Sequence, residues 1–244
     1  MRVLILSDIH SNAIALEAVL ADAGSYDQLW NLGDTIGYGP QPNECMAAMR
    51  ERASFMILGN HDMACIGSLD LSDFNPDART ANLWNGKQLL EEHRQALLKL
   101  HNMLEIDERF LMAHGSPREP VWEYLLTRAQ AIANFKVFTN NICFIGHSHV
   151  PLVFQCHEDG HCDGPASPDA ERLVRLKPEM RYIINPGSVG QPRNQDSRSS
   201  YIIFDTEANT VLFRRVSYDI AKTQDLMNAA NLPEMLVVRL QYGM

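Results

Sequence analysis

The sequence predicts an α/β protein in which two sheets pack face to face with helices on the outside. Short apolar runs alternate with helical patterns through the first half of the chain, and after residue 150 most runs follow one another as antiparallel strands do. Of the 244 residues, 45% are hydrophobic and 21% are charged, which is typical of a chain that buries a large core. Because internal repeats and low-complexity tracts are absent, the order of the elements predicts one domain over residues 1–244.

The first half carries the alternation of strand and helix that is typical of parallel strands joined by crossover helices. Asn12 is a suitable cap for a helix whose apolar stripe is Ala13, Leu16, Val19, Leu20 and Ala23. Residues 59–80 are rich in turn formers. The other elements expected here are strands at 3–7, 28–32 and 54–58, a helix at 44–50, and a long helix at 81–100 with leucines at 83, 90, 97 and 100.

The second half changes to a pattern of strands with few helices. The polar stretch 157–171 contains Gly160, Gly164, Pro165 and Pro168, which favours a hairpin loop over a domain boundary. The expected strands are 110–113, 142–145, 152–156, 172–176, 182–184, 200–205 and 211–217, with helices at 128–135 and 219–230.

The charge balance limits the classes of partner. Thirty acidic residues against 21 basic ones give a formal charge of −9, so a local basic groove would have to carry any nucleic-acid binding. No apolar run approaches the roughly 18 residues that span a bilayer, and the first residues lack a cleavable signal pattern. Five scattered cysteines argue against a disulfide framework and for a reducing, cytoplasmic location.

Five polar fragments each follow a predicted strand. Because the loops at the carboxyl ends of strands in an α/β sheet line one crevice, we expect these fragments to converge. The spacing from Asp8 to Asp34 and from Asp34 to Asn60 is 26 residues, close to one strand-helix-strand unit. The fragments are Asp8-Ile9-His10, Gly33-Asp34, Gly59-Asn60-His61-Asp62, His114-Gly115 and Gly146-His147-Ser148-His149.

The residue types indicate a metal centre. Imidazoles, carboxylates and one carboxamide oxygen suit Mn, Fe, Zn, Co or Ni better than Ca. Seven ligands are too many for one ion but match two ions about 3.5–4 Å apart that share a carboxylate, and Asp34, alone in its fragment, is the natural bridge. A simpler alternative remains for single fragments, since Gly59-Asn60-His61-Asp62 also has the composition of a turn. His93 and His101 flank a helical pattern and are expected at the surface.

In this order the fragments resemble those of the calcineurin-like metallophosphoesterase superfamily, and the match spans residues 8–149. The resemblance implies a four-layer α-β-β-α sandwich with a dinuclear metal centre whose bridging hydroxide attacks phosphorus. Two divalent ions, with Mn, Fe, Zn, Ni or Co as candidates, would be held by seven side chains. Asp8, His10 and His149 would hold one ion, Asn60, His114 and His147 the other, and Asp34 would bridge them.

The same resemblance gives catalytic roles to Asp34 and His61, the latter facing the leaving oxygen, and substrate contacts to Asn60 and His61. A further loop, 185–193, resembles a segment of the small prokaryotic phosphodiesterase-type members of the superfamily. In that loop Arg193, or alternatively Arg198 nearby, is a candidate to bind a phosphate oxygen, with Arg118 as a weaker one. The loop could equally serve only to join two strands.

Two departures bear on the substrate. The Ser/Thr phosphatases of the superfamily continue Gly-Asp-x-x-Asp-Arg-Gly, whereas here Gly37 replaces the carboxylate that orients the catalytic histidine and Tyr38 replaces a phosphate-binding arginine. Asp62 is a candidate substitute for that carboxylate. Separately, Cys156-His157 and His161-Cys162 mirror each other around residues 158–160, which favours a hairpin tip over a zinc site because the usual Cys-x₂-Cys spacing is absent.

We therefore expect a hydrolase that cleaves phosphodiesters or phosphomonoesters of small molecules or nucleotides. The alternatives on the same fold are a nucleoside-polyphosphate hydrolase, a phosphoprotein phosphatase, a nuclease, and a non-catalytic scaffold like the retromer subunit. The scaffold alternative predicts missing ligands, and every ligand position here is filled. Nothing in the sequence specifies an oligomeric state.

Overall fold

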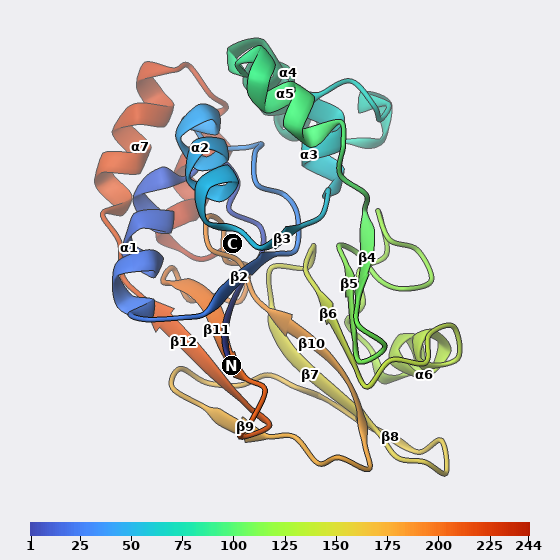
Figure 1. Ribbon diagram of the computed structural model, residues 1–244. Helices are drawn as coiled ribbons and strands as arrows, with labels where there is room; N and C mark the ends of the chain where they lie inside the picture. Colours follow the sequence, from blue (N-terminus) through green and yellow to red (C-terminus); the bar gives the residue numbers. More distant parts are fainter.

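Two six-stranded mixed sheets pack face to face, and helices cover their outer faces, in the computed structural model of residues 1–244 (Figure 1). The first sheet has the strand order β3-β2-β1-β11-β12-β9 and the second the order β4-β5-β6-β10-β7-β8. Each sheet contains three neighbouring parallel strands, β3-β2-β1 in the first and β5-β6-β10 in the second. The predicted four-layer sandwich of mixed sheets is confirmed.

The strands fall close to the predicted runs. In the first sheet they are β1 (Arg2–Leu6), β2 (Gln28–Asn31), β3 (Phe55–Met56), β9 (Leu173–Arg175), β11 (Ser199–Asp205) and β12 (Thr210–Val216). In the second sheet they are β4 (Met103–Ile106), β5 (Phe110–Ala113), β6 (Ile142–Ile145), β7 (Pro151–Cys156), β8 (Cys162–Ala166) and β10 (Arg181–Pro186). Strand β4 was not expected, and β8 lies inside the stretch 157–171 that was expected to be a hairpin loop.

The helices differ more from the expectation. They are α1 (Ala13–Ala23), α2 (Pro42–Arg52), α3 (Asn60–Cys65), α4 (Pro76–Gln88), α5 (Glu91–Leu97), α6 (Arg128–Phe135), α7 (Ile220–Ala229) and α8 (Glu234–Val238), with short 3₁₀ turns at Leu71–Asp73 and Arg239–Gln241. None of them is long and apolar enough to cross a bilayer. The expectation of a turn-rich stretch at 59–80 was wrong, because α3 and the start of α4 lie within it.

The single helix predicted for 81–100 is instead two helices. Leu89 and Leu90 adopt extended backbone angles between α4 and α5. Asn43 of α2 stabilises this break, because its side chain donates to the Gln88 carbonyl and accepts from the Leu90 amide. Leu83 on α4 and Leu90 at the break are both exposed, so the leucines do not form one buried stripe.

His93 was also expected at the surface and is buried instead. His93 lies on α5 with Nδ1 2.9 Å from the guanidinium of Arg50 on α2, and burial lowers the pKa of the imidazole. His101 lies at the surface, as expected. The difference arises because α5 docks on α2, a tertiary contact that a helical pattern alone does not reveal.

Successive side chains of a strand point to opposite faces of the sheet, and this alternation separates the apolar layer between the sheets from the layers under the helices. Val3 and Ile5 of β1 face the other sheet and pack with Trp30 and Phe144, whereas Leu4 and its neighbour Leu6 face α1 and α2. Strands buried on both faces read as continuous apolar runs, which is why β1 and β6 lack a polar face. Helix α6 covers the outer face of the second sheet in the same way.

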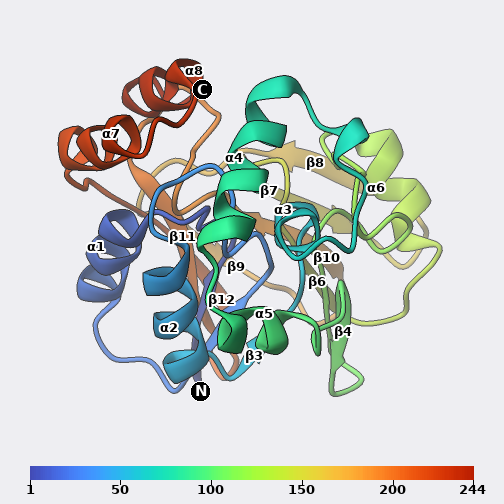
Figure 2. The same ribbon diagram turned by 90° about the horizontal axis from the view of Figure 1, so that it is seen from above.

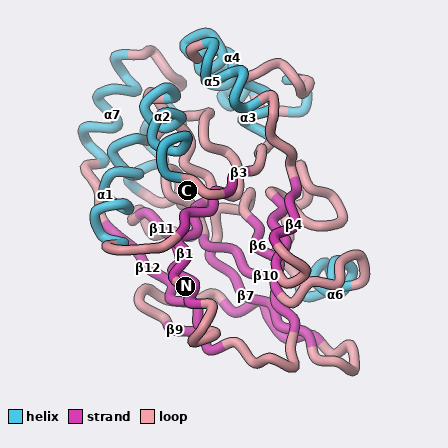
Figure 3. The backbone as a smooth tube through the Cα atoms, viewed as in Figure 1, coloured by secondary structure: helices cyan, strands magenta, loops and turns pink.

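The remaining helices gather at one end of the sandwich (Figure 3). Seen from above, α4 runs between the second sheet and the pair α7 and α8 (Figure 2). An apolar cluster joins these helices to the loop after β2, with Tyr38, Phe74, Ala81, Met227 and Leu236 among its members. The loops at this end of the strands are therefore enclosed by helices.

Candidate metal centre

The polar fragments follow five of the six parallel strands, on both sheets. Asp8 and His10 follow β1, Asp34 follows β2, and Asn60 begins α3 directly after β3. The second sheet contributes His114 after β5, and His147 and His149 after β6. Because these strand ends meet between the two sheets, residues separated by up to 139 positions lie within hydrogen-bonding distance.

The side chains form two groups that share one residue. Within each group, one potential ligand atom per residue lies within 4.8 Å of all the others. The first group contains Asp8, His10, Asp34 and His149, and the second contains Asp34, His114 and His147. All six are buried, with at most 3% of each residue exposed.

Specific distances define each group. His149 Nε2 lies 3.1 Å from His10 Nε2 and 3.2 Å from Asp8 Oδ1. Asp34 Oδ2 lies 3.6 Å from His10 Nε2 and 3.3 Å from His114 Nε2, so this single oxygen faces both groups. Asn60 Oδ1 lies 3.2 Å from His114 Nε2, which places the carboxamide beside the second group.

Hydrogen bonds from the backbone fix the orientation of these side chains. The His61 and His147 amides donate to Asp34 Oδ1 and Asp8 Oδ2, leaving the other oxygen of each carboxylate free. The Nδ1 atoms of His114 and His149 contact the carbonyls of Leu32 and Gln191, so their Nε2 atoms face the groups. Such outer partners are typical of metal-binding histidines because they fix the tautomer and the ring orientation.

The backbone at these positions is unusual. Asp8, His10, Asp34 and both His147 and His149 have φ between 50° and 63°, in the left-handed region that side-chain-bearing residues rarely adopt. All lie beyond the ends of their strands. Residues two apart in a regular strand would point to one face, and the left-handed turns instead spread His147 and His149 between the two groups.

The electrostatics suit cation binding. Burial opposes ionisation of Asp34, but neighbouring histidines, His114 foremost, outweigh it and hold the pKa of the carboxyl well below its ordinary value. Burial lowers the pKa of His10 and takes that of His147 to about 3, so these imidazoles are neutral at pH 7. Ionised carboxylates and neutral imidazoles are the forms that bind metals.

Unpartnered polar atoms provide a test of fit. Asp8 Oδ1, Asp34 Oδ2 and His147 Nε2 are fully buried and accept or donate no hydrogen bond within the protein. Leaving a buried charged group unpaired costs several kcal/mol, so such atoms in a stable fold imply a missing partner. Two divalent cations, one at each group, would supply it, and the nitrogen and oxygen donor set suits first-row transition metals.

His61 lies beside these groups and belongs to neither. Its ring centroid is 4.9 Å from that of His10, 4.2 Å from that of Tyr38 and 5.0 Å from that of Phe74. Its Nδ1 lies 2.8 Å from Asn82 Oδ1, on α4. Asp62, the candidate partner from sequence, instead accepts from the Ile36 and Gly59 amides, so that expectation was wrong.

The comparisons with known proteins agree with this centre. Residues 1–209 match the family model of the calcineurin-like phosphoesterase superfamily domain. The chain belongs to this superfamily. An uncharacterised protein of Methanocaldococcus jannaschii is 35% identical over 98% of this chain and 97% of its own length. A symmetrical bis(5′-nucleosyl)-tetraphosphatase of Photorhabdus laumondii is 25% identical over 78% of this chain and 70% of its own length.

Solved structures show the same fold. A metallophosphoesterase from Sphaerobacter thermophilus is 48% identical, with a TM-score of 0.89 over 100% of this chain and 99% of its own. A hypothetical protein of Pyrococcus horikoshii, 20% identical, shares the fold with a TM-score of 0.80 over 100% of this chain and 98% of its own. The protein is thus a metallophosphoesterase, a hydrolase acting on phosphoester bonds, and its superfamily uses divalent metals.

Of the three arginines considered from sequence, only Arg193 reaches the centre of this phosphoesterase. Its Nη2 donates to the Tyr38 hydroxyl at 3.2 Å, and its buried Nε has no partner. Arg198 makes an exposed pair with Asp196, and Arg118 pairs with Glu123. The loop 185–193 begins at the end of β10, the sixth parallel strand, which explains why it arrives beside the other loops.

The cysteine–histidine hairpin is separate from the metal centre. Cys156 and Cys162 pair as a disulfide, while Cys45, Cys65 and Cys143 are free, so the five cysteines form one local bridge and no wider framework. The register of β7 and β8 sets these cysteines directly opposite each other, which sequence spacing did not disclose. His157 is half-buried and His161 is exposed, and the disulfide occupies both sulfurs, so the four side chains do not form one metal site.

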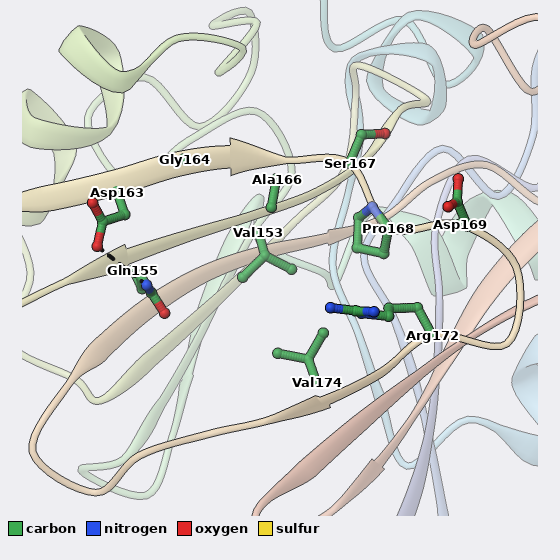
Figure 4. A pocket seen from close by; sticks show the side chains of 10 residues that line it. All are labelled: Val153, Gln155, Asp163, Gly164, Ala166, Ser167, Pro168, Asp169, Arg172 and Val174. Atoms are coloured by element: carbon green, nitrogen blue, oxygen red, sulfur yellow. Dashed lines mark hydrogen bonds between the residues drawn. The ribbon is translucent and has the colours of Figure 1, made fainter.

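A sizeable cavity also lies away from the metal centre. It measures about 440 Å³ and lies between the β7–β8 hairpin and β9, at the edges of the two sheets (Figure 4). Figure 4 shows Arg172 reaching toward Val153 and Val174, with Pro168 above. No histidine or cysteine lines this cavity, so it lacks the imidazole ligands of the candidate metal centre.

Proposed function

We propose that this protein hydrolyses phosphodiesters or phosphomonoesters of small molecules or nucleotides, using two divalent ions held by Asp8, His10, Asp34, Asn60, His114, His147 and His149. The observation that carries the proposal is that Asp34 Oδ2, buried and without a partner, faces both ligand groups at once. Two-ion sites that share a carboxylate are suited to in-line displacement at phosphorus, because both reacting oxygens are stabilised. When bound, the ions supply an activated water and neutralise developing charge on the phosphoryl oxygens.

The side chains then divide the work. Asp34 belongs to both ligand groups, whereas Asn60 lies beside the second group and also contacts the substrate. His61, outside both groups and next to His10, donates a hydrogen bond or proton to the leaving oxygen. Arg193 binds a phosphoryl oxygen through its free Nε, and its bond to the Tyr38 hydroxyl orients the guanidinium.

A second candidate is hydrolysis of dinucleoside polyphosphates. Its support is the 25% identity to curated symmetrical bis(5′-nucleosyl)-tetraphosphatases over 78% of this chain. Phosphoprotein phosphatase activity has less support, because Gly37 and Tyr38 replace a carboxylate and an arginine of that class. A scaffold role has the least support, since no ligand position is missing.

Three further proposals concern the metal, the cellular location and the domain organisation of the protein. We take Mn as the first metal to test, with Fe, Zn, Ni and Co as alternatives for the same donor set. The free buried thiols of Cys45, Cys65 and Cys143 support a cytoplasmic location. A single domain over residues 1–244 is supported beyond the matched region, because β12 pairs with β11 and α7 and α8 pack against the Tyr38 loop.

The test compares bis-p-nitrophenyl phosphate, p-nitrophenyl phosphate and diadenosine tetraphosphate across a panel of divalent metals. We expect turnover that chelation abolishes and that Mn or another panel metal restores. Asp34→Ala should lose turnover under every metal, whereas Asp163→Ala, on the distant hairpin, should retain it. Activity that survives Asp34→Ala would overturn the proposal, and the preferred substrate decides between the two candidate functions.

A further inference from the structure

The imidazole of His61 has one hydrogen-bonding partner, and it comes from a different element from the metal ligands. Asn82 lies on α4, fully buried, with Oδ1 2.8 Å from His61 Nδ1. A carboxamide oxygen only accepts, so the proton at this contact belongs to His61 Nδ1. The Nε2 atom is then left for a group on the other side of the ring.

The loop after β2 is shaped to permit this contact. Gly37 has φ of 105°, and a Cβ placed there would lie 2.8 Å from His61 Cβ, 3.0 Å from His61 Nδ1 and 3.1 Å from Asn82 Oδ1. A side chain at position 37 therefore cannot coexist with the His61–Asn82 pair in this geometry. The absence of a carboxylate at position 37 and the presence of an acceptor on α4 are two parts of one arrangement.

Other acceptors near His61 are already engaged. The oxygens of Asp62 accept from the Ile36 and Gly59 amides at 3.0 Å each. Asp34 Oδ1 accepts from the His61 backbone amide and not from its ring. Asn85, one turn further along α4, binds Ser11 and the Gly37 amide and so holds the loop in place. Asn82 is thus the side chain that fixes the His61 ring.

We propose that Asn82 is a positioning residue for His61: its oxygen accepts from Nδ1–H in the neutral resting ring and in the protonated ring alike, which keeps Nε2 facing the leaving oxygen of the substrate. In the substrate complex Nε2 takes up a proton from solvent and passes it to the leaving oxygen as the bond to phosphorus breaks, which returns the neutral Nδ1–H ring. This inference rests on the proposed function, in which His61 assists departure of that oxygen. The inference has a consequence of its own, because protonation of the leaving oxygen by His61 matters only when the leaving group is poor. Loss of Asn82 should therefore slow substrates according to their leaving groups, whereas loss of a metal ligand should slow all of them.

The experiment uses two diesters of equal charge and similar shape, bis-p-nitrophenyl phosphate and diphenyl phosphate, whose leaving groups differ in basicity. For Asn82→Leu we expect kcat on diphenyl phosphate to fall by about 10- to 100-fold, with under about threefold loss on the nitrophenyl ester. Asn82→Asp keeps an acceptor oxygen and should restore most of the lost rate. Gly37→Ala should reproduce the leaving-group dependence, because its Cβ displaces the pair.

Two controls separate positioning from folding. Asn140→Leu removes another buried asparagine, one that bonds Glu105 and the Glu108 carbonyl near the start of β6, and should show equal effects on both esters. In a His61→Gln background, Asn82→Leu should add no further loss, since residues that act as one unit are not additive. An equal loss on both esters, or additive losses in the double variant, would overturn the inference.

A readout without turnover distinguishes failure of the inference from failure of the proposed function. In ¹⁵N NMR of the zinc-loaded protein, assigned by difference with His61→Gln, we expect the His61 ring as the Nδ1–H tautomer in the wild type and a changed signature in Asn82→Leu. A wild-type protein without phosphoesterase turnover would refute the proposed function. An Nε2–H tautomer in the wild type would refute the positioning of His61 by Asn82 whatever the turnover.

Discussion

The protein carries two clusters of histidine and aspartate that look alike in composition and differ in environment. One lies at the carboxyl ends of the parallel strands, and the other at the far end of the β7–β8 hairpin. In the hairpin, the side chains of His157, His161 and Asp163 are 38%, 58% and 45% exposed. In the metal centre, by contrast, Asp8, Asp34 and His114 have no exposed surface.

The hydrogen bonding of the two clusters differs in the same direction. Each hairpin imidazole places Nε2 3.1 Å from one oxygen of Asp163, so the three groups satisfy one another without an ion. The buried carboxylates Asp8 and Asp34 each keep an oxygen without a partner. The comparison teaches that burial without a partner, rather than residue type alone, identifies a cation site.

The largest contrast is expected from removing one aspartate of each cluster. Asp34→Asn should lower kcat at least about 10³-fold, because it removes the shared ligand and with it several kcal/mol of charge stabilisation. Asp163→Asn should leave kcat within about twofold, since Asp163 bonds only His157, His161 and Gln155, all far from the ligand groups. Steady-state rates with bound-metal content by mass spectrometry check both. Equal losses in the two variants would remove the distinction between the clusters.

Chelation should reveal the same contrast in stability. Saturating divalent metal at about 1,000 times its Kd stabilises the folded state by about 4 kcal/mol, which raises the Tm of a chain of this length by on the order of 10 °C. Removing the metal should therefore lower Tm by that amount in the wild type and in His157→Gln. In Asp34→Asn the shift should largely vanish. Scanning calorimetry with and without chelator measures it, and a full shift in Asp34→Asn would contradict the assignment.

The convergence of the candidate ligands could be predicted from the sequence because each of them follows a strand, and parallel strands deliver their ends to one place. The strands themselves were predictable from uninterrupted apolar runs such as those of β1 and β6. The assembly of the two ligand groups follows from these two facts, with left-handed turns at His10 and His149 completing it.

What could not be predicted depends on how helices dock. The break at Leu89 depends on Asn43 of α2, and the burial of His93 depends on Arg50 of the same helix. The role of Asn82 depends on α4 lying over the loop after β2. A helical pattern specifies one face of a helix and leaves open which partner that face meets. The replacement of a carboxylate by Gly37 was the one sequence signal that another partner for His61 was needed.

Metal binding at the centre should also depend on pH, because His114 holds a proton there. In the metal-free centre, burial would lower the pKa of His114, but the negative charge of Asp34, whose Oδ2 lies 3.3 Å from His114 Nε2, outweighs burial and raises that pKa to about 9. Metal binding must then displace this proton at neutral pH, so apparent Mn affinity should rise about tenfold per pH unit from about pH 7 to pH 9 and then level off. Calorimetric titrations in buffers of different ionisation enthalpy should show proton release at pH 7.5. An affinity unchanged between pH 7 and pH 9 would contradict this electrostatic account.

The smallest effect on activity is expected at the hairpin disulfide. Replacing both Cys156 and Cys162 by serine opens a loop with a sequence separation of six, for which the chain-entropy estimate of lost stability is about 2 kcal/mol. Because this loop lies at the far end of β7 from His149, kcat and metal content should be unchanged. Urea unfolding of the variant and of the reduced wild type should give matching midpoints. Loss of bound metal in the serine variant would show that the hairpin supports the centre after all, and the two clusters would then have to be treated as one coupled system.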